Sequence, residues 1–217
     1  MPELDEIIAK RIENGREYRK IEIQNIEVRS EKDDEMIVEG YATTFNQPYE
    51  LYNWGNYRVN EQIDSAAFND CDMSDVIMQY DHRGRVFARV SNKTLEVKTD
   101  DHGLHVRADL SGTEIGRQLF EEIKGGYTSK MSFGFVVGED TRTVTEDHVN
   151  NITTVLRTIT KITKLYDVSA VSLPANDATE ISARAFGEGV IAEARAERSA
   201  ADQRANRVRK LKLMLEV

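Results

Sequence analysis

Apolar residues recur at every second position along most of the chain, which is the pattern of half-buried β-strands. Ile26 and Val28 follow this pattern, and Met36 and Val38 follow it again after a charged stretch at residues 31–34. This part of the sequence therefore predicts an antiparallel hairpin. Further strands are predicted over residues 76–80, 86–90, 94–98, 104–110, 131–137, 155–162 and 165–173. We therefore expect a body that is rich in β-structure.

Both ends of the chain are predicted to be helical. Apolar residues in the first 19 positions are spaced by four among many charges. Residues 187–217 are rich in Ala, Arg and Glu, and their apolar residues also have helical spacing. The sequence thus predicts a helical arm over residues 1–19, a body over residues 20–186 and a helical tail over residues 187–217.

Two helices and one loop are predicted to interrupt the strands of the body. Ser65 can cap a short helix over residues 66–71, and Thr113 can cap a longer helix that ends at Gly125. Residues 49–57 are rich in Tyr, Asn and Gly and predict a loop. The expected fold class is α+β, with a mostly antiparallel sheet and a few helices.

Composition narrows the functional classes. The formal net charge of the 217 residues is −9, which does not favour a nucleic-acid partner. The single cysteine, Cys71, excludes an internal disulfide and fits a reducing compartment. No apolar run approaches the length of a membrane span, and no signal peptide is evident. We expect a protein that works in a cytoplasm, away from membranes.

Ser132 is the first candidate for chemistry. In the segment Met-Ser-Phe-Gly-Phe at residues 131–135, the Met and both Phe residues point to one face of a strand and Ser132 to the other. The neighbouring Gly134 suggests that another backbone, such as a peptide substrate, approaches closely there. On this pattern alone, an ordinary small strand residue is the favoured interpretation of Ser132, and Ser129 is a weaker candidate for chemistry.

A serine hydroxyl needs a base, because it is almost fully protonated at neutral pH. His82 stands out among the four histidines, since it follows Val76, Met78 and Tyr80 at period two and continues an inward-facing row. The other three histidines lie in polar turns or segments. His82 is therefore the candidate base, although a structural role fits the same position.

Asp167 is the third unusual position. It lies in mid-strand on the face that also carries Leu165, Ser169 and Val171. Burial of a carboxylate among such side chains costs free energy unless the carboxylate is paired and hydrogen-bonded. An imidazole N–H is one suitable partner, and a structural ion pair with Arg or Lys is the alternative.

Other chemistries are not indicated. There is no zinc-ligand spacing, Walker loop or dinucleotide fingerprint, so we predict no cofactor and no metal. The Gly-x-Ser-x-Gly elbow of α/β-hydrolases is absent as well.

An ordered set of short motifs resembles the prohead (capsid maturation) protease family of tailed bacteriophages. Each motif alone is weak, but the set is specific and spans roughly residues 20–185. The matching segments are EQIDSAAF at residues 61–68, YDH at 80–82, MSFGF at 131–135, LYDVS at 165–169 and LPAN at 173–176. Two positions depart from the family pattern: Ala66 replaces a usual Gly, and Asp167 replaces a frequent Glu.

The resemblance implies a fold and a mechanism. The family is similar to herpesvirus assemblins, so the core would be β-barrel-like, mostly antiparallel and wrapped by helices. The protein would be a serine endopeptidase in which Ser132 attacks the scissile carbonyl, His82 takes its proton and Asp167 holds the imidazole. Assemblins use a histidine in the third role, so His148 is the rival of Asp167.

The resemblance also implies partners. The substrates would be a scaffolding protein, or the scaffolding segment of the phage major capsid protein, and the protease's own termini. The compartment would be the immature capsid in the host bacterial cytoplasm, and a homo-oligomer is compatible with this. We expect the helical tail to contact the scaffold and to be removed by self-cleavage near Gly187 and Gly189.

Two alternatives stay open. The chain could be a catalytically inactive capsid-assembly or scaffolding module. It could also be a different hydrolase, which uses Asp81, Asp100 or Asp101 with a metal.

Overall fold

The computed structural model describes residues 16–21, 27–29, 36–171, 203–204 and 207. Most of them belong to β-strands. The elements are β1 (Arg16–Ile21), β2 (Glu27–Arg29), β3 (Ile37–Thr44), β4 (Tyr49–Trp54), β5 (Tyr57–Ile63), β6 (Ile77–Tyr80), β7 (Arg83–Arg89), β8 (Leu95–Thr99), β9 (Gly103–Asp109), α2 (Glu114–Lys124), β10 (Lys130–Asp147) and β11 (Ile152–Val171).

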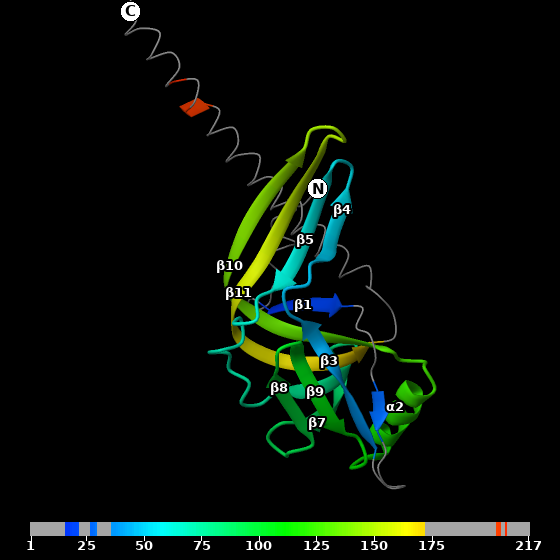
Figure 1. Cartoon of the computed structure of the whole chain (residues 1–217). Coiled ribbons are helices and arrows are strands. Elements are labelled where there is room, and N and C mark those ends of the chain that lie inside the picture. The colour runs from blue at the N-terminus through cyan, green and yellow to red at the C-terminus, as the bar shows by residue number, and fades with distance from the viewer. Residues whose placement is uncertain (1–15, 22–26, 30–35, 172–202, 205–206, 208–217) are drawn as a thin grey trace, which may run out of the picture.

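The strands form two sheets (Figure 1). The larger sheet has the order β1-β10-β11-β5-β4, and β6 and β7 extend it beside the second half of β11. The smaller sheet has the order β2-β3-β9-β8. Strands β1, β4 and β7 remain edges of the larger sheet, so the described strands do not close into the barrel-like core that we expected.

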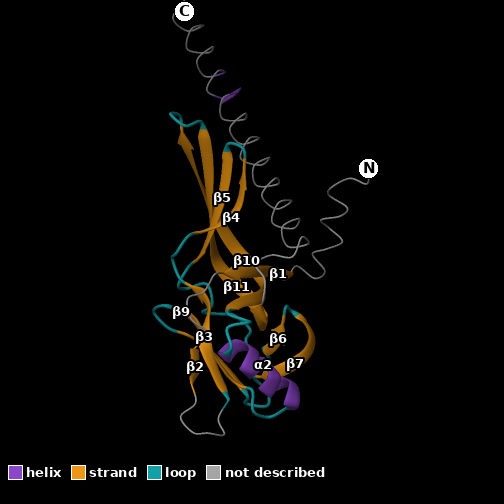
Figure 2. Ribbon diagram, turned by 90° about the vertical axis from the view of Figure 1, so that its right-hand side faces the viewer, coloured by secondary structure: helices purple, strands orange, loops and turns teal. Residues whose placement is uncertain are grey.

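Strand β11 is the centre of the larger sheet. It is antiparallel to β10 along its whole length, and parallel first to β5 and then to β6. The outer half of the β10–β11 hairpin projects from the molecule together with β4 and β5 (Figures 1 and 2). The inner halves of the same two strands lie near β6, β7 and α2.

The core lies between the inner part of the larger sheet, the smaller sheet and α2. Phe133 and Phe135 are fully buried, and their rings stack with centroids 4.5 Å apart. Helix α2 adds three buried side chains, those of Leu119, Phe120 and Ile123. Burial of such side chains contributes about 1.5–3 kcal/mol each, which holds both strands and helix in place.

The long helix and the first hairpin confirm their predictions. The Thr113 hydroxyl accepts a hydrogen bond from Gly116 N at 3.0 Å, and Gly125 N–H donates to the Glu121 carbonyl at 2.8 Å. These are the N-cap and the C-terminal bond that the sequence predicts. Val28 pairs with Val38 across β2 and β3.

Residues 49–57 are not a loop. They form β4, a two-residue turn that begins at Gly55, and the start of β5. Gly55 has a φ of +59°, which a glycine adopts without strain. The aromatic residues that suggested a loop are good strand formers, and the turn sits between them.

Residues 66–71 are a series of turns, not a helix. Ala67 N–H donates to the Asp64 carbonyl and Cys71 N–H to the Phe68 carbonyl, which are bonds between residues three apart. The Asp64 carboxylate accepts from Ala66 N–H at 2.8 Å. The segment is too short to form the longer-range bonds of a stable α-helix.

The predicted helical ends fall largely outside the described residues. Residues 1–15 of the arm lie outside, but residues 16–19 belong to β1, so the arm prediction is wrong for them. Most of the tail also lies outside. The two strands predicted over residues 155–162 and 165–173 are one continuous strand, β11, up to Val171. In the described part of the chain, no helix is long and apolar enough to cross a membrane.

Candidate active site

The turn between β6 and β7 carries His82. Tyr80 pairs with Arg83, so Asp81 and His82 are the two residues of the turn. Their φ angles are +48° and +58°, as in a type I′ hairpin turn, and Asp and His tolerate this region better than most residues. Asp81 N–H donates to the Ala170 carbonyl at 3.0 Å, which anchors the turn to β11.

The strand ends at Tyr80, as the sequence predicted, and Val76 and Met78 are fully buried. His82 does not continue their row within a strand, because it lies in the turn that follows. The imidazole of His82 is nevertheless largely buried. Its side chain is 11% exposed.

Strands β10 and β11 present two pairs of facing residues beneath this turn. Ser132 pairs with Ser169, and Gly134 pairs with Asp167. Directly opposed residues of an antiparallel pair point to the same face. Gly134 has no side chain, which leaves room on this face for the carboxyl group of Asp167.

A chain of two hydrogen bonds connects the three candidate residues. The distance from His82 Nδ1 to Asp167 Oδ1 is 2.5 Å, and the distance from His82 Nε2 to Ser132 Oγ is 2.6 Å. A carboxylate only accepts hydrogen bonds, so Nδ1 carries the proton and Nε2 is left to accept one from the serine hydroxyl. Ser132 and Asp167 are both buried. This arrangement can move the hydroxyl proton to a base that a buried carboxylate orients.

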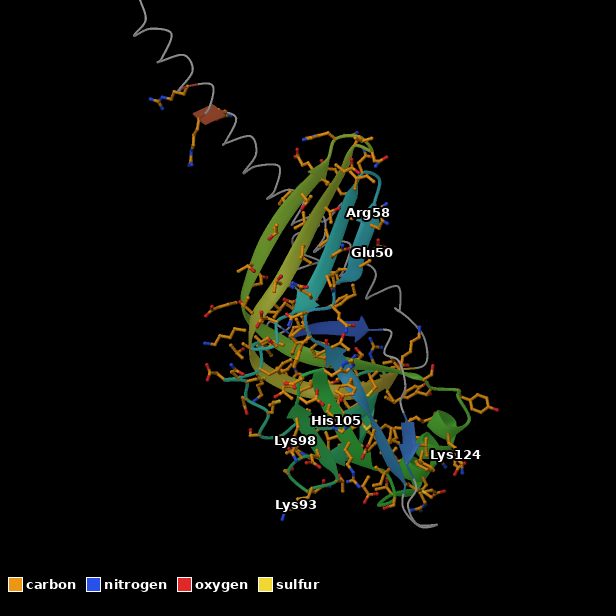
Figure 3. All side chains as sticks on the ribbon, in the orientation of Figure 1. Glu50, Arg58, Lys93, Lys98, His105 and Lys124 are labelled. Carbon is orange, nitrogen blue, oxygen red and sulfur yellow. The ribbon has the colours of Figure 1, made fainter. Side chains whose placement is uncertain are left out.

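The other histidines lie elsewhere. His148 is exposed in the turn between β10 and β11, with Nε2 3.8 Å from Glu146 Oε2. His102 immediately precedes β9 and His105 lies within it, and both contact the ring of Tyr41 edge-on; Figure 3 labels His105 on β9. The geometry thus brings together Ser132, His82 and Asp167, and leaves His148 at the far end of the β10–β11 hairpin.

A fourth side chain, that of Ser169, joins this place. Ser169 Oγ donates a hydrogen bond to Asp167 Oδ1 at 2.9 Å, and both residues are buried. The strand pattern put Ser169 on the same face as Asp167, but it did not indicate a role for the hydroxyl.

The three aspartates considered for a metal do not come together. Asp100 accepts hydrogen bonds from the Tyr41 hydroxyl at 2.7 Å and from the N–H groups of His102 and Gly103. These bonds close the turn between β8 and β9. Among the described residues, no three His, Cys, Asp or Glu side chains are grouped as a metal site would need.

A groove opens next to the turn that carries His82. It lies between one face of β7 and one face of α2, and its volume is about 380 Å³. Both apolar and charged side chains line it. The lining residues are Tyr80, Arg83, Arg85, Phe87, Ile115, Gln118, Leu119 and Glu122.

One protein family matches most of the chain. A family model described as caudovirus prohead serine protease matches residues 24–190 of the chain. A solved structure of the bacteriophage T4 capsid assembly protease, gp21, aligns with a TM-score of 0.36 and 12% identity, covering 73% of this chain and 98% of that one. No curated protein matches the chain.

Proposed function

Because the chain belongs to the caudovirus prohead serine protease family, we propose that it is a serine endopeptidase whose nucleophile is Ser132. His82 is its general base and Asp167 the third member of the triad. The observation that carries this assignment is the continuous hydrogen-bond chain from Asp167 through His82 to Ser132.

The geometry supports a two-step acyl transfer. Ser132 Oγ forms a bond to the scissile carbonyl carbon while its proton moves to His82 Nε2, and Asp167 stabilises the resulting imidazolium. His82 then gives that proton to the leaving amine as the C–N bond breaks. Water, deprotonated by His82, hydrolyses the acyl-enzyme and restores the serine.

Two observations favour Asp167 over His148 as the third member. The Asp167 carboxylate faces Nδ1 of His82, on the side of the ring opposite to Ser132. His148 is exposed at the tip of the hairpin and contacts Glu146. A buried carboxylate at this position also fixes the tautomer, which an exposed imidazole in a distant turn does not.

We further propose the substrates from the family's description as prohead proteases. They are a scaffolding protein, or the scaffolding segment of the major capsid protein, and the protease itself. The reaction takes place in the immature capsid within the bacterial cytoplasm. The tail at residues 187–217 contacts the scaffold and is removed by self-cleavage near Gly187 and Gly189. Glycine favours the extended conformation in which a protease binds its substrate.

The direct test is labelling with a fluorophosphonate probe, which reacts with activated serines. Wild-type protein should be labelled at Ser132, and Ser132→Ala should lose both the label and the processing of co-expressed capsid protein. His82→Ala should have a comparable effect, since members of a triad act as a unit. Ser129→Ala is the matched control, because Ser129 is exposed just before β10. Normal processing by Ser132→Ala would contradict the proposal and favour an inactive assembly module.

Self-cleavage needs its own test. Intact-mass analysis of wild-type protein after co-expression with the capsid protein should show loss of the tail, whereas Ser132→Ala should keep it. A tail that is intact in mature particles would contradict this part of the proposal and leave the assignment of Ser132 untouched.

A further inference from the structure

We propose that Ser169 is a positioning residue of the active site, which holds the Asp167 carboxylate in the orientation that His82 requires. This inference rests on the proposed role of Asp167. The supporting contact is the hydrogen bond from Ser169 Oγ to Asp167 Oδ1, at 2.9 Å.

Two donors converge on one oxygen of the carboxylate. Asp167 Oδ1 accepts from His82 Nδ1 at 2.5 Å and from Ser169 Oγ at 2.9 Å. A carboxylate with one partner can rotate about its Cβ–Cγ bond, whereas a second donor from a different direction fixes the plane of the group. The second donor comes from the same strand and does not depend on the turn that carries His82.

Ser169 is well placed to act as a rigid support. Its residue is fully buried, and β11 is flanked there by β10 and by β6. A buried hydroxyl without a partner is costly, so the bond to Asp167 also accounts for a polar side chain at this core position. Ser169 faces Ser132 across the two strands, so one face of the sheet carries the nucleophile and the support of its base.

The test compares Ser169→Ala with Ser169→Thr, which keeps the hydroxyl. Hydrogen bonds to charged groups contribute about 1.5–3 kcal/mol, which corresponds to about 10- to 150-fold. We expect Ser169→Ala to lower kcat/KM for a scaffold-derived peptide at least about tenfold, through kcat and with KM nearly unchanged. Ser169→Thr should stay within about threefold of wild type. The matched control is Thr160→Val, because Thr160 donates from β11 to the Glu139 carbonyl away from the site.

Stability is measured in parallel, so that loss of folding is not mistaken for loss of positioning. If Ser169→Ala does not fold, Ser169→Cys replaces it, since a thiol fills similar space and is a weak donor. Ser169→Cys should then show the same loss of kcat. A folded Ser169→Ala or Ser169→Cys protein with wild-type kcat would overturn the inference. An equal loss of kcat in a folded Ser169→Thr protein would do so too.

The failure of this inference and that of the proposed function are distinguishable. Ser132→Ala is inactive and unlabelled by fluorophosphonate if the triad is correct, whatever Ser169 does. An active Ser132→Ala protein would remove the proposed function itself.

Discussion

Replacing Asp167 by Asn tests the electrostatic part of the mechanism with almost no change in shape. The carboxylate oxygen lies 2.5 Å from Nδ1 of His82, and its side chain is 3% exposed. For charge centres about 4 Å apart at an effective dielectric constant of about 20, the attraction between carboxylate and imidazolium is about 4 kcal/mol. Loss of the charge alone therefore predicts a rate about 10³-fold lower.

The amide has a second effect, on the tautomer. If its NH₂ group faces Nδ1, the imidazole must carry its proton on Nε2 and can no longer accept the proton of Ser132. The two effects together predict a decrease of kcat by about 10³- to 10⁴-fold, with KM nearly unchanged. The assay is single-turnover cleavage of a scaffold-derived peptide, together with the rate of fluorophosphonate labelling at Ser132.

The outcome discriminates between the two candidates for the third member. His148→Ala is the matched variant and should keep nearly full activity, because His148 is exposed in a distant turn. An Asp167→Asn enzyme that keeps more than about a tenth of the wild-type rate would refute the electrostatic argument. A larger loss for His148→Ala than for Asp167→Asn would reverse the assignment.

Three further predictions concern the surroundings of the site. If peptide substrates bind in the groove between β7 and α2, Gln118→Trp should raise KM for a peptide, while labelling by a small fluorophosphonate stays unchanged. An unchanged KM would exclude the groove as the peptide-binding site, and Gln118→Ala is the control. Arg157→Met leaves the buried carboxylate of Glu61 without its cation and should lower the free energy of unfolding by about 3–5 kcal/mol in urea titrations. A loss below about 1 kcal/mol would contradict this. Burial raises the pKa of the Cys71 thiol to about 11. Alkylation of Cys71 at pH 8 should therefore be at least about 100-fold slower in folded than in urea-unfolded protein. Equal rates would show that the thiol is accessible.

Much of the fold follows from local patterns in the sequence. The alternation in β9 is visible in the sequence, and its apolar side chains Leu104, Val106 and Ala108 are buried. Helix α2 has both a start and an end signal, Thr113 and Gly125, and its bounds agree with them. Such elements are predictable because the residues that define them are neighbours in the chain.

The position of the site follows from a different kind of signal. Ser132 and Asp167 are polar residues in segments that are otherwise apolar, and such residues need a partner in the core. That argument selects residues, but it does not give their partners. The partners are set by the register of β10 on β11 and by the parallel pairing of β6 with β11, both of which join residues far apart in sequence.

The turn at His82 shows where periodicity stops being informative. A two-residue turn and two further strand residues give the same alternation, so the sequence places Tyr80 and His82 in one row. Only the left-handed conformation of Asp81 and His82 distinguishes them, and neither residue is a glycine that would have marked the turn. The loop prediction for residues 49–57 was wrong for a related reason, because strands rich in Tyr and Asn resemble a loop in composition.

The burial of Arg157 and its ion pairs could not be predicted from the sequence. Arg157 lies in a threonine-rich strand where an arginine is expected to be exposed, yet its side chain is 4% exposed. Its guanidinium binds Glu61 of β5, Asp140 of β10 and Glu17 of β1. Strand β1 pairs through its backbone with residues 131–136 of β10, the segment that contains Ser132. One buried cation thus joins the projecting hairpin, its neighbour β5 and the edge strand beside the nucleophile. Only the pairing of four strands, which are distant in sequence, makes that position buried.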